Sequence, residues 1–305
     1  MHIPTFVLEG IELPRVILSI QPSKGSDVQE TVSLMKTSYE MGALCFDLPT
    51  KSHLEAFREL KNLVEEESLI GLSHVEAGEG ASLLGKPLHH FAPKIASTIK
   101  KNLFPPQLVT TLKKEGVWSS KFFFPTSSSA EVFTQKEIDR IRFDADRFDK
   151  ALFNFRQSET PFLVIGRKYG DWLSALGRID LLQSMVARAR ERGFRPIFYS
   201  YWTTFVLPKT KTIDVAAYAV PINKRWSLFD PEQAFQLIKK FDRPVIGFNP
   251  FAEGELMQDS EEAFSFLFQE LRIHGAIVEV TSKEEVTKTL NAIEAFPSII
   301  HRQKT

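Results

Sequence analysis

Apolar residues in the C-terminal part of the chain alternate between short continuous runs and helical spacing. The runs 245–248 and 277–280 are typical of buried strands. Between them, residues 263–271 place apolar side chains on one face of a helix. Ser282, followed three residues later by Glu285, predicts the capped start of a final helix. A strand–helix–strand–helix unit of this kind implies parallel strands.

The same alternation extends back through most of the chain. It predicts an α/β fold, a closed (β/α)8 barrel with parallel strands. An open doubly wound sheet is the rival, but it normally carries a glycine-rich phosphate loop, and the sequence contains neither G-x-G-x-x-G nor G-K-[ST]. The other expected strands are residues 15–21, 43–46, 69–75, 151–155, 196–199 and 215–220, and residues 161–165 are either a strand or part of a loop.

The regular alternation fails between residues 77 and 132, where Gly, Pro, Ser and His residues interrupt it. We interpret the segment 77–132 as an insertion that covers one end of the barrel within a single domain, residues 1–305. Short helices are expected at 95–103 and 108–114. The apolar run 122–124 is an extra strand or even the true third strand.

The composition of the 305-residue chain restricts its partners. Lys plus Arg and Asp plus Glu each number 38, so no general attraction to nucleic acid or to a membrane is expected. The single cysteine, Cys45, lies in an apolar run and predicts a buried, reduced thiol. The N-terminus does not resemble a signal peptide, and no apolar run reaches membrane-spanning length. We therefore expect a cytoplasmic protein with a small-molecule ligand; the oligomeric state stays open.

Four stretches together resemble the aldo/keto reductase family, whose members are TIM barrels, that is (β/α)8 barrels, using NADP. Residues 10–15, GIELPR, are similar to the family's N-terminal hairpin, and residues 40–47, EMGALCFD, to its second strand ending in aspartate. Residues 249–256, NPFAEGEL, look like its S-P-L-A-x-G-x-L motif, and residues 281–286, TSKEEV, like its phosphate-binding turn. The resemblance implies an oxidoreductase-like barrel that binds NADP or another phosphate-bearing ligand.

The catalytic residues that this resemblance implies are largely missing. The family uses a tyrosine as proton donor, a lysine that lowers its pKa, an aspartate that holds the lysine and a histidine that orients the substrate. Only the aspartate, Asp47, is present. The tyrosine position falls on Ser52, the lysine position on His74 and the histidine position on Asn154. Asp47, His74 and Asn154 are therefore the candidate catalytic residues, but ordinary aldo/keto reductase chemistry lacks its proton donor.

The implied cofactor contacts also depart from the family pattern. The Ser-Asn pair after the fifth strand corresponds to Ser200-Tyr201, and Phe248 replaces the aromatic residue that stacks on the nicotinamide. The sixth-strand glutamine appears as Ala216 and the late asparagine as Thr289. The candidate cofactor-binding residues are Ser200, Tyr201, Phe248, Asn249, Thr281, Ser282 and Lys283.

The turn at residues 281–283 has a physical reason to hold phosphate. It leaves a predicted strand and enters a helix N-terminus, where unpaired backbone N–H groups and the helix dipole attract anions. Lys283 adds a positive charge, and Glu284 and Glu285 weaken the local field. The alternative is a simple helix cap without a ligand.

Further candidates follow from the rule that the C-terminal ends of barrel strands face the site. His74 and Glu76 lie on one face of their strand because strand side chains alternate, and with Asp47 they could ligate a divalent metal. A hydrogen-bonded pair without metal is the alternative.

Four residues are candidates for substrate binding. Arg156 follows the expected fourth strand and could bind a carboxylate or phosphate, or form a surface ion pair. Tyr199 and Trp202, next to Tyr201, could stack on a flat ligand or pack in the core. With Glu76 these residues complete the substrate-binding set: Glu76, Arg156, Tyr199 and Trp202.

Three functions fit these patterns. The first is a divergent aldo/keto reductase-like oxidoreductase that binds NADP or another phosphate-bearing ligand. The second is a metal-assisted lyase or hydrolase that uses Asp47, His74 and Glu76. The third is a non-catalytic ligand-binding protein on an altered enzyme scaffold, without a cofactor.

Overall fold

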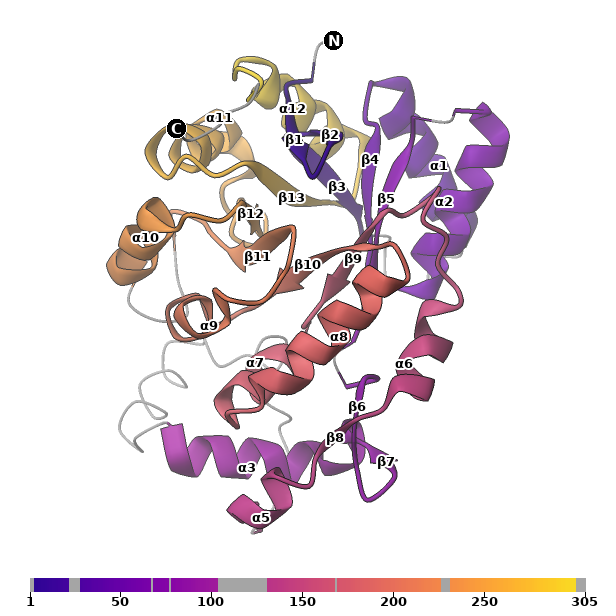
Figure 1. The fold of residues 1–305 in the computed structure, drawn as a ribbon. Coiled ribbons are helices and arrows are strands. Elements are labelled where there is room, and N and C mark those ends of the chain that lie inside the picture. Colours follow the sequence, from indigo (N-terminus) through magenta and orange to yellow (C-terminus); the bar gives the residue numbers. More distant parts are fainter. Residues whose placement is uncertain are drawn as a thin grey trace. The chain divides into compact units, whose positions relative to one another are not determined.

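The structure is a computed structural model that describes residues 3–21, 28–66, 68–76, 78–103, 131–167, 169–225 and 231–299. Eight strands form a closed parallel barrel in which neighbours follow chain order (Figure 1). They are β3 (Val16–Ile20), β4 (Cys45–Leu48), β5 (Ile70–Val75), β9 (Phe162–Ile165), β10 (Arg195–Tyr199), β11 (Ala217–Pro221), β12 (Val245–Phe248) and β13 (Gly275–Val280). The predicted closed (β/α)8 barrel is confirmed, and the open sheet is wrong.

Helices alternate with these strands, as the sequence pattern predicts. The α-helices are α1 (Val28–Glu40), α2 (Lys51–Val64), α3 (Ala92–Leu103), α5 (Gln135–Ile138), α6 (Ala145–Leu152), α7 (Tyr169–Ala175), α8 (Ile179–Glu191), α9 (Thr203–Thr210), α10 (Pro231–Lys240), α11 (Ser260–Ser265) and α12 (Lys283–Glu294). Two short 3-10 helices, η1 (Leu88–Phe91) and η2 (Met257–Asp259), and a π-helical turn, η3 (Phe266–Glu270), complete the helical elements of the described residues.

The chain divides into two compact units. The first contains residues 1–74, 155–163 and 216–305, and the second contains residues 75–154 and 164–215. In the first unit, an antiparallel hairpin of β1 (Thr5–Leu8) and β2 (Ile11–Pro14) precedes β3. The prediction of a single domain stays a prediction.

The second unit contains a small antiparallel sheet outside the barrel. Its order is β7 (Lys86–Pro87), β6 (Ala81–Leu83) and β8 (Arg142–Phe143). The helix expected at 95–103 is confirmed as part of α3, whereas the expected helix 108–114 and the run 122–124 lie outside the described residues. The third barrel strand is β5, as first expected. The role of 77–132 as a cover for the barrel stays a prediction.

The expected fourth strand is wrong. Residues 151–155 contain the end of α6 and a turn, and the fourth barrel strand is β9, in the stretch 161–165 that the sequence left between strand and loop. In so short a stretch, the spacing of the apolar residues of α6 fits a helix as well as a strand. β9 is buried along its whole length, which explains its continuous apolar run.

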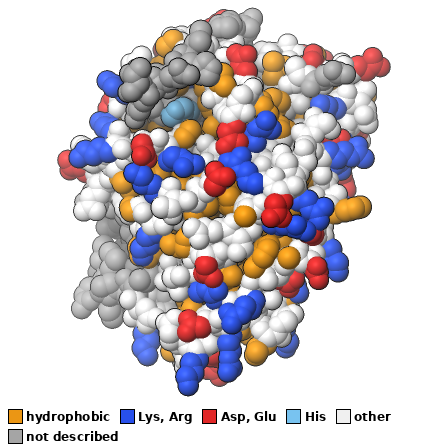
Figure 2. Space-filling view, in the orientation of Figure 1, with side chains coloured by type: hydrophobic (Ala, Val, Ile, Leu, Met, Phe, Trp, Pro, Cys, Tyr) orange, Lys and Arg blue, Asp and Glu red, His pale blue; other side chains and the backbone are white. Residues whose placement is uncertain are grey.

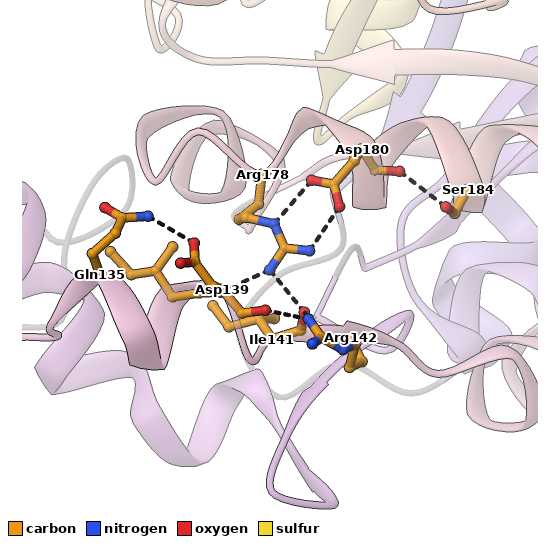
Figure 3. A network of polar contacts seen from close by, with 8 residues as sticks. Gln135, Asp139, Ile141, Arg142, Arg178, Asp180 and Ser184 are labelled. Atoms are coloured by element: carbon orange, nitrogen blue, oxygen red, sulfur yellow. Dashed lines mark hydrogen bonds and ion pairs between the residues drawn. The ribbon is translucent and has the colours of Figure 1, made fainter.

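Arg178 links the segment around β8 to the start of α8 through hydrogen bonds (Figure 3). Its guanidinium donates to both carboxylate oxygens of Asp180, at 2.9 and 2.7 Å. It also donates to the carbonyl oxygens of Ile138 and Ile141, both at 2.7 Å. The guanidinium thus donates to main-chain carbonyl oxygens before β8 and to a carboxylate of α8. Arginine can make these contacts together because its donors lie in a planar fork, which lysine lacks.

The surface carries charges of both signs. On the face drawn in Figure 2, Lys and Arg side chains lie among Asp and Glu side chains, in agreement with the balanced charge of the chain. No helix in the described part of the chain has the length and apolar character needed to cross a membrane.

A buried arginine holds the start of the barrel in the first unit. The Arg15 side chain precedes β3, and the residue is 3% exposed. It donates to the carbonyl oxygens of Ile273, His274 and Pro297 at 2.9, 3.1 and 3.0 Å, and its guanidinium lies 4.0 Å from the ring centre of Phe268. Burial lowers the pKa of Arg15 to about 10, so it stays charged at neutral pH.

We predict that Arg15→Met lowers the free energy of unfolding by about 2–5 kcal/mol, because one buried and two part-buried carbonyl oxygens lose a charged donor. Urea denaturation measures the difference. The matched control is Arg156→Met, since the Arg156 side chain is 71% exposed and pairs only at the surface with Glu159 at 3.2 Å. Equal losses in the two variants would contradict the assignment of Arg15 as a buried anchor.

Candidate functional site

Asp47 and His74 form a buried pair in the first unit. The Oδ1 atom of Asp47 lies 2.5 Å from Nε2 of His74, and their side chains are 7% and 5% exposed. The other carboxylate oxygen of Asp47 accepts a hydrogen bond from the Ser19 hydroxyl at 2.9 Å. Gln21 donates its amide to the same hydroxyl at 3.3 Å. Two of the three predicted catalytic residues therefore meet, and Ser19 and Gln21 join them.

The strands determine which way this pair points. Phe46, next to Asp47 on β4, packs against Phe57 of α2 with ring centres 6.2 Å apart. Because side chains alternate along a strand, Asp47 lies on the face turned away from α2, toward the inside of the barrel. Ser19 pairs with Asp47 in register across β3 and β4, so its side chain lies on that face too.

A second histidine supports the end of β3. His53, near the start of α2, places Nε2 2.7 Å from the carbonyl oxygen of Ile20 and Nδ1 2.6 Å from the Thr50 hydroxyl. A carbonyl oxygen only accepts, so Nε2 of His53 carries a proton. Thr50 also caps α2 by accepting from the backbone N–H of His53 at 3.4 Å. The contact fixes the strand end that carries Ser19.

The three side chains of the metal-site alternative are not grouped in this structure. Asp47 and His74 direct polar atoms at each other, and Glu76 lies beyond β5 as an exposed residue of the second unit. Across the residues that the structure describes, no group of three or more His, Cys, Asp or Glu side chains is arranged to hold a metal ion. The hydrogen-bonded pair of Asp47 and His74, which the sequence left open as the alternative, is present.

Asn154 and Arg156 do not lie at a strand's C-terminal end. Both residues are exposed and precede β9. Arg156 forms an ion pair with Glu159 at 3.2 Å, and the carbonyl oxygen of Glu159 accepts from the backbone N–H of Gly71, near the start of β5. The turn containing Arg156 therefore lies at the N-terminal end of the strands. Its placement at a substrate site followed from the wrong fourth strand, and the surface ion pair is present instead.

In the second unit, a buried carboxylate organises the end of β10. Asp171, on α7, accepts from the Ser200 hydroxyl at 2.6 Å and from the backbone N–H of Tyr201 at 2.8 Å. The Ser200 oxygen also accepts from the backbone N–H of Trp202 at 3.1 Å. Both functions of the Ser200 hydroxyl are thus engaged within the chain. Burial raises the pKa of Asp171 to about 7.

The aromatic candidates follow one another at the end of β10. Tyr199 and Tyr201 meet edge to face with ring centres 5.3 Å apart, and Trp202 is 1% exposed. The Tyr201 hydroxyl bonds to Tyr199 and Arg167. Burial raises the pKa of Tyr201, and the nearby Arg167 opposes the rise. Trp202 is packed in the core, and the Tyr201 hydroxyl is engaged by Tyr199 and Arg167.

Phe248 is the last residue of β12, and Asn249 begins the loop that follows. Phe248 is 5% exposed, so its ring is buried in this conformation. Asn249 adopts a left-handed backbone with φ of 54°, and its side-chain oxygen accepts from the backbone N–H of Glu253 at 2.8 Å. Its amide donates to the Glu253 carboxylate at 3.3 Å. The side chain of Asn249 is therefore engaged by its own loop.

The predicted phosphate turn is occupied by a carboxylate of the chain. The backbone N–H and hydroxyl of Thr281 donate to Glu285 at 2.6 and 2.9 Å. Ser282 caps α12 by accepting from the backbone N–H of Glu285 at 3.3 Å, as the sequence predicted. The Glu285 carboxylate lies where a phosphate oxygen would be expected, and Lys283 is exposed beside it. A phosphate would have to displace this carboxylate.

Sequence reasoning missed Ser19, Asp171 and Arg167 as members of these clusters. Ser19 lies within an apolar strand, and a single hydroxyl there gives no periodic signal. Arg167 would have been found had residues 162–165 been taken as the fourth strand, because it then follows a strand's C-terminal end. Asp171 lies within a short helix, and nothing in the local sequence indicates its burial.

Comparisons with known proteins agree with this architecture. No protein-family model and no curated protein matches the sequence. Among solved structures, an aldo-keto reductase from Bacillus halodurans in its holo form matches with a TM-score of 0.56 at 12% identity, covering 98% of this chain and 93% of that chain. A thermostable aldo-keto reductase in complex with the inhibitor epalrestat matches with a TM-score of 0.54 at 13% identity, covering 96% and 95%.

An aldo/keto reductase from Brucella melitensis also matches, with a TM-score of 0.51 at 12% identity over 98% of this chain and 96% of that chain. At these identities the likeness establishes the fold. The chain is a (β/α)8 barrel. Its fold is that of the aldo-keto reductases, in a divergent form, which confirms the resemblance seen in the sequence.

We predict a pH-dependent stability that originates at Asp171. Its folded pKa of about 7 lies above the ordinary value of 3.8, so its contribution is fully present below pH 3.8 and is lost as the pH rises through about 7. Asp171→Asn mimics the protonated acid. Between about pH 5 and about pH 8 the unmodified protein should lose roughly 2–4 kcal/mol of unfolding free energy relative to this variant.

Urea denaturation at each pH measures this difference. Asp146→Asn is the control, because Asp146 is exposed on α6 in the same unit. If the profiles of the unmodified protein and Asp171→Asn stay parallel over this range, Asp171 is not the group responsible.

We also predict that Glu285 limits phosphate binding at Thr281. Glu285→Ala releases the two donors of Thr281, and affinity for NADP or inorganic phosphate should rise on the order of tenfold, the scale of one charge-assisted hydrogen bond. Isothermal titration measures the affinities. Glu284→Ala is the matched control, since it removes the same charge from an exposed neighbour bonded to Lys288 at 2.8 Å. Equal gains in both variants would mean that only net charge matters.

Proposed function

We propose that this protein performs acid–base chemistry on a small carbonyl- or hydroxyl-bearing molecule, with Asp47 and His74 as the proton-transferring pair. The observation that carries the proposal is the 2.5 Å contact between Asp47 and His74 on the inner face of the barrel. The lysine position of the aldo/keto reductase pattern falls on His74, so the aspartate that would hold a lysine holds a histidine instead. A histidine is also the side chain that most readily exchanges protons near neutral pH.

The geometry gives each residue a role. Asp47 fixes the imidazole through Nε2 and compensates the charge when His74 is protonated. Ser19 holds the second oxygen of Asp47 and so fixes the orientation of the carboxylate. The low exposure of both side chains strengthens their interaction, because little water screens it. His74 can then receive a proton from a carbon next to a carbonyl, or give one to a developing alkoxide.

NADP is the cofactor that the aldo/keto reductase resemblance suggests, and it would supply hydride. The predicted contacts do not fit it in the conformation described. Thr281 donates to Glu285, the Ser200 hydroxyl is engaged by Asp171 and Trp202, and Asn249 is engaged by Glu253. We therefore assign no step to NADP. The same three contacts support a second candidate, a non-catalytic ligand-binding barrel.

Proton transfer by His74 predicts deuterium incorporation into a small hydroxycarbonyl probe. In heavy water, glyceraldehyde and dihydroxyacetone should exchange the hydrogen on the carbon next to the carbonyl for deuterium. The exchange is measured by NMR in the absence of any nicotinamide cofactor. His74→Gln and Asp47→Asn should slow this exchange about 100-fold or more, the usual contribution of a general base. Arg156→Gln, a change at the exposed turn, should leave the rate unchanged.

Two further results would separate the alternatives. Exchange by the unmodified protein at the rate of buffer alone, with ligands still perturbing the His74 resonance, would favour the non-catalytic barrel. Reduction of the same probes with NADPH, lost in His74→Gln, would favour the oxidoreductase with His74 as proton donor.

A further inference from the structure

We infer that Gln21 is a positioning residue of the candidate site, which acts through Ser19 to hold the Asp47 carboxylate against the imidazole. Gln21 directly follows β3 and is half-buried. Its role rests on the proposed function of Asp47 and His74 as the proton-transferring pair. It acts on the rate of proton transfer and not on the affinity for the ligand.

The hydrogen bonds of this cluster run in one direction, from Gln21 to Asp47. An ionised carboxylate only accepts, so the Ser19 hydroxyl donates its single proton to Asp47 Oδ2, at 2.9 Å. The Ser19 oxygen then has only lone pairs left, and the amide nitrogen of Gln21 faces them at 3.3 Å. Gln21 therefore holds the hydroxyl in the orientation that keeps its proton on Asp47.

Ser19 transmits this contact because a hydroxyl donates and accepts at the same atom. The residue is 2% exposed, so little water competes for either hydrogen bond. In a sheltered chain of this kind, each hydrogen bond polarises the next one and strengthens it. The amide of Gln21 therefore affects the Asp47 carboxylate although Ser19 lies between them.

The main chain fixes the strand end that carries the two side chains. Ser19 and Gln21 lie two residues apart, so they share one face of the extended chain. Between them, the carbonyl oxygen of Ile20 accepts from Nε2 of His53 at 2.7 Å. The backbone N–H of Gln21 donates to the carbonyl oxygen of Val280, at the end of β13, at 2.8 Å. The end of β3 is thus bonded to two other elements of the first unit, α2 and β13.

The orientation of the carboxylate matters because it determines where the imidazole lies. A carboxylate held at one oxygen can turn about its last side-chain torsion, which has broad minima. Asp47 is held at both oxygens, by His74 at 2.5 Å and by Ser19. Loss of the second contact would let the carboxylate turn and carry the imidazole with it. A misplacement of about 1 Å can slow a reaction ~100-fold, so a small turn is measurable.

The test is a double-mutant cycle on the deuterium exchange of glyceraldehyde. Gln21→Leu removes the amide donor and should lower kcat about fivefold, the scale of one hydrogen bond, with KM unchanged. Ser19→Ala should lower kcat by at least as much. In the Ser19→Ala background, Gln21→Leu should have no further effect, because its connection to Asp47 is gone.

Gln29→Leu is the matched control. It removes the same amide from an exposed position in the same unit, where Gln29 donates to Glu59 at 3.0 Å. This variant should keep the kcat and KM of the unmodified protein. Urea denaturation of every variant ensures that folded proteins are compared.

Three results would overturn the role of Gln21 and leave the proposed function standing. The first is an unchanged kcat in Gln21→Leu. The second is an equal loss of kcat from Gln21→Leu with and without Ser19, which would show that Ser19 does not transmit the effect. The third is a higher KM at unchanged kcat, which would make Gln21 a ligand contact. Exchange that His74→Gln does not slow would instead refute the proposed function, and this role with it.

Discussion

The alternation of side chains along parallel strands is the constraint on which this molecule depends. Closing eight strands into a barrel leaves each strand one face for the helices and one face for the interior. On β4 this rule sends Phe46 toward α2 and Asp47 inward, where it meets Ser19 and His74. A slip of one residue in register would exchange the two faces, burying the carboxylate against a helix without its partners. The contacts of Asp47 with Ser19 and His74 are therefore a product of the same geometry that builds the core.

The chain's own carboxylates engage polar groups at the ends of three barrel strands. Glu285 binds Thr281, Glu253 binds Asn249 and Asp171 binds Ser200. Each contact satisfies donors at a strand end, which would otherwise need water or a ligand. The Asp47–His74 pair differs from these contacts, because it joins two barrel strands and lies on their inner face.

The sequence predicted the barrel and the meeting of Asp47 with His74, and the reasons for its failures are local. Strand β9 and helix α6 each contain an apolar run that is too short for its periodicity to distinguish a strand from a helix. For this reason the sequence places Asn154 and Arg156 at a strand end. Glu285 was expected to complete a capping box with Ser282, but its carboxylate reaches one residue further back, to Thr281. Which donor a carboxylate binds depends on side-chain geometry, and the spacing of residues along the sequence does not specify that geometry.

The anchoring of Arg15 has a consequence for which positions of this chain can change. Its partners at positions 273, 274 and 297 are main-chain carbonyl oxygens, which every amino acid supplies. Substitutions at those positions can therefore accumulate without removing the acceptors, provided that the backbone keeps its path. The arginine itself has no such latitude, because no other side chain offers a planar fork of donors. Distant relatives that have lost all other likeness would still be expected to keep an arginine directly before the first barrel strand.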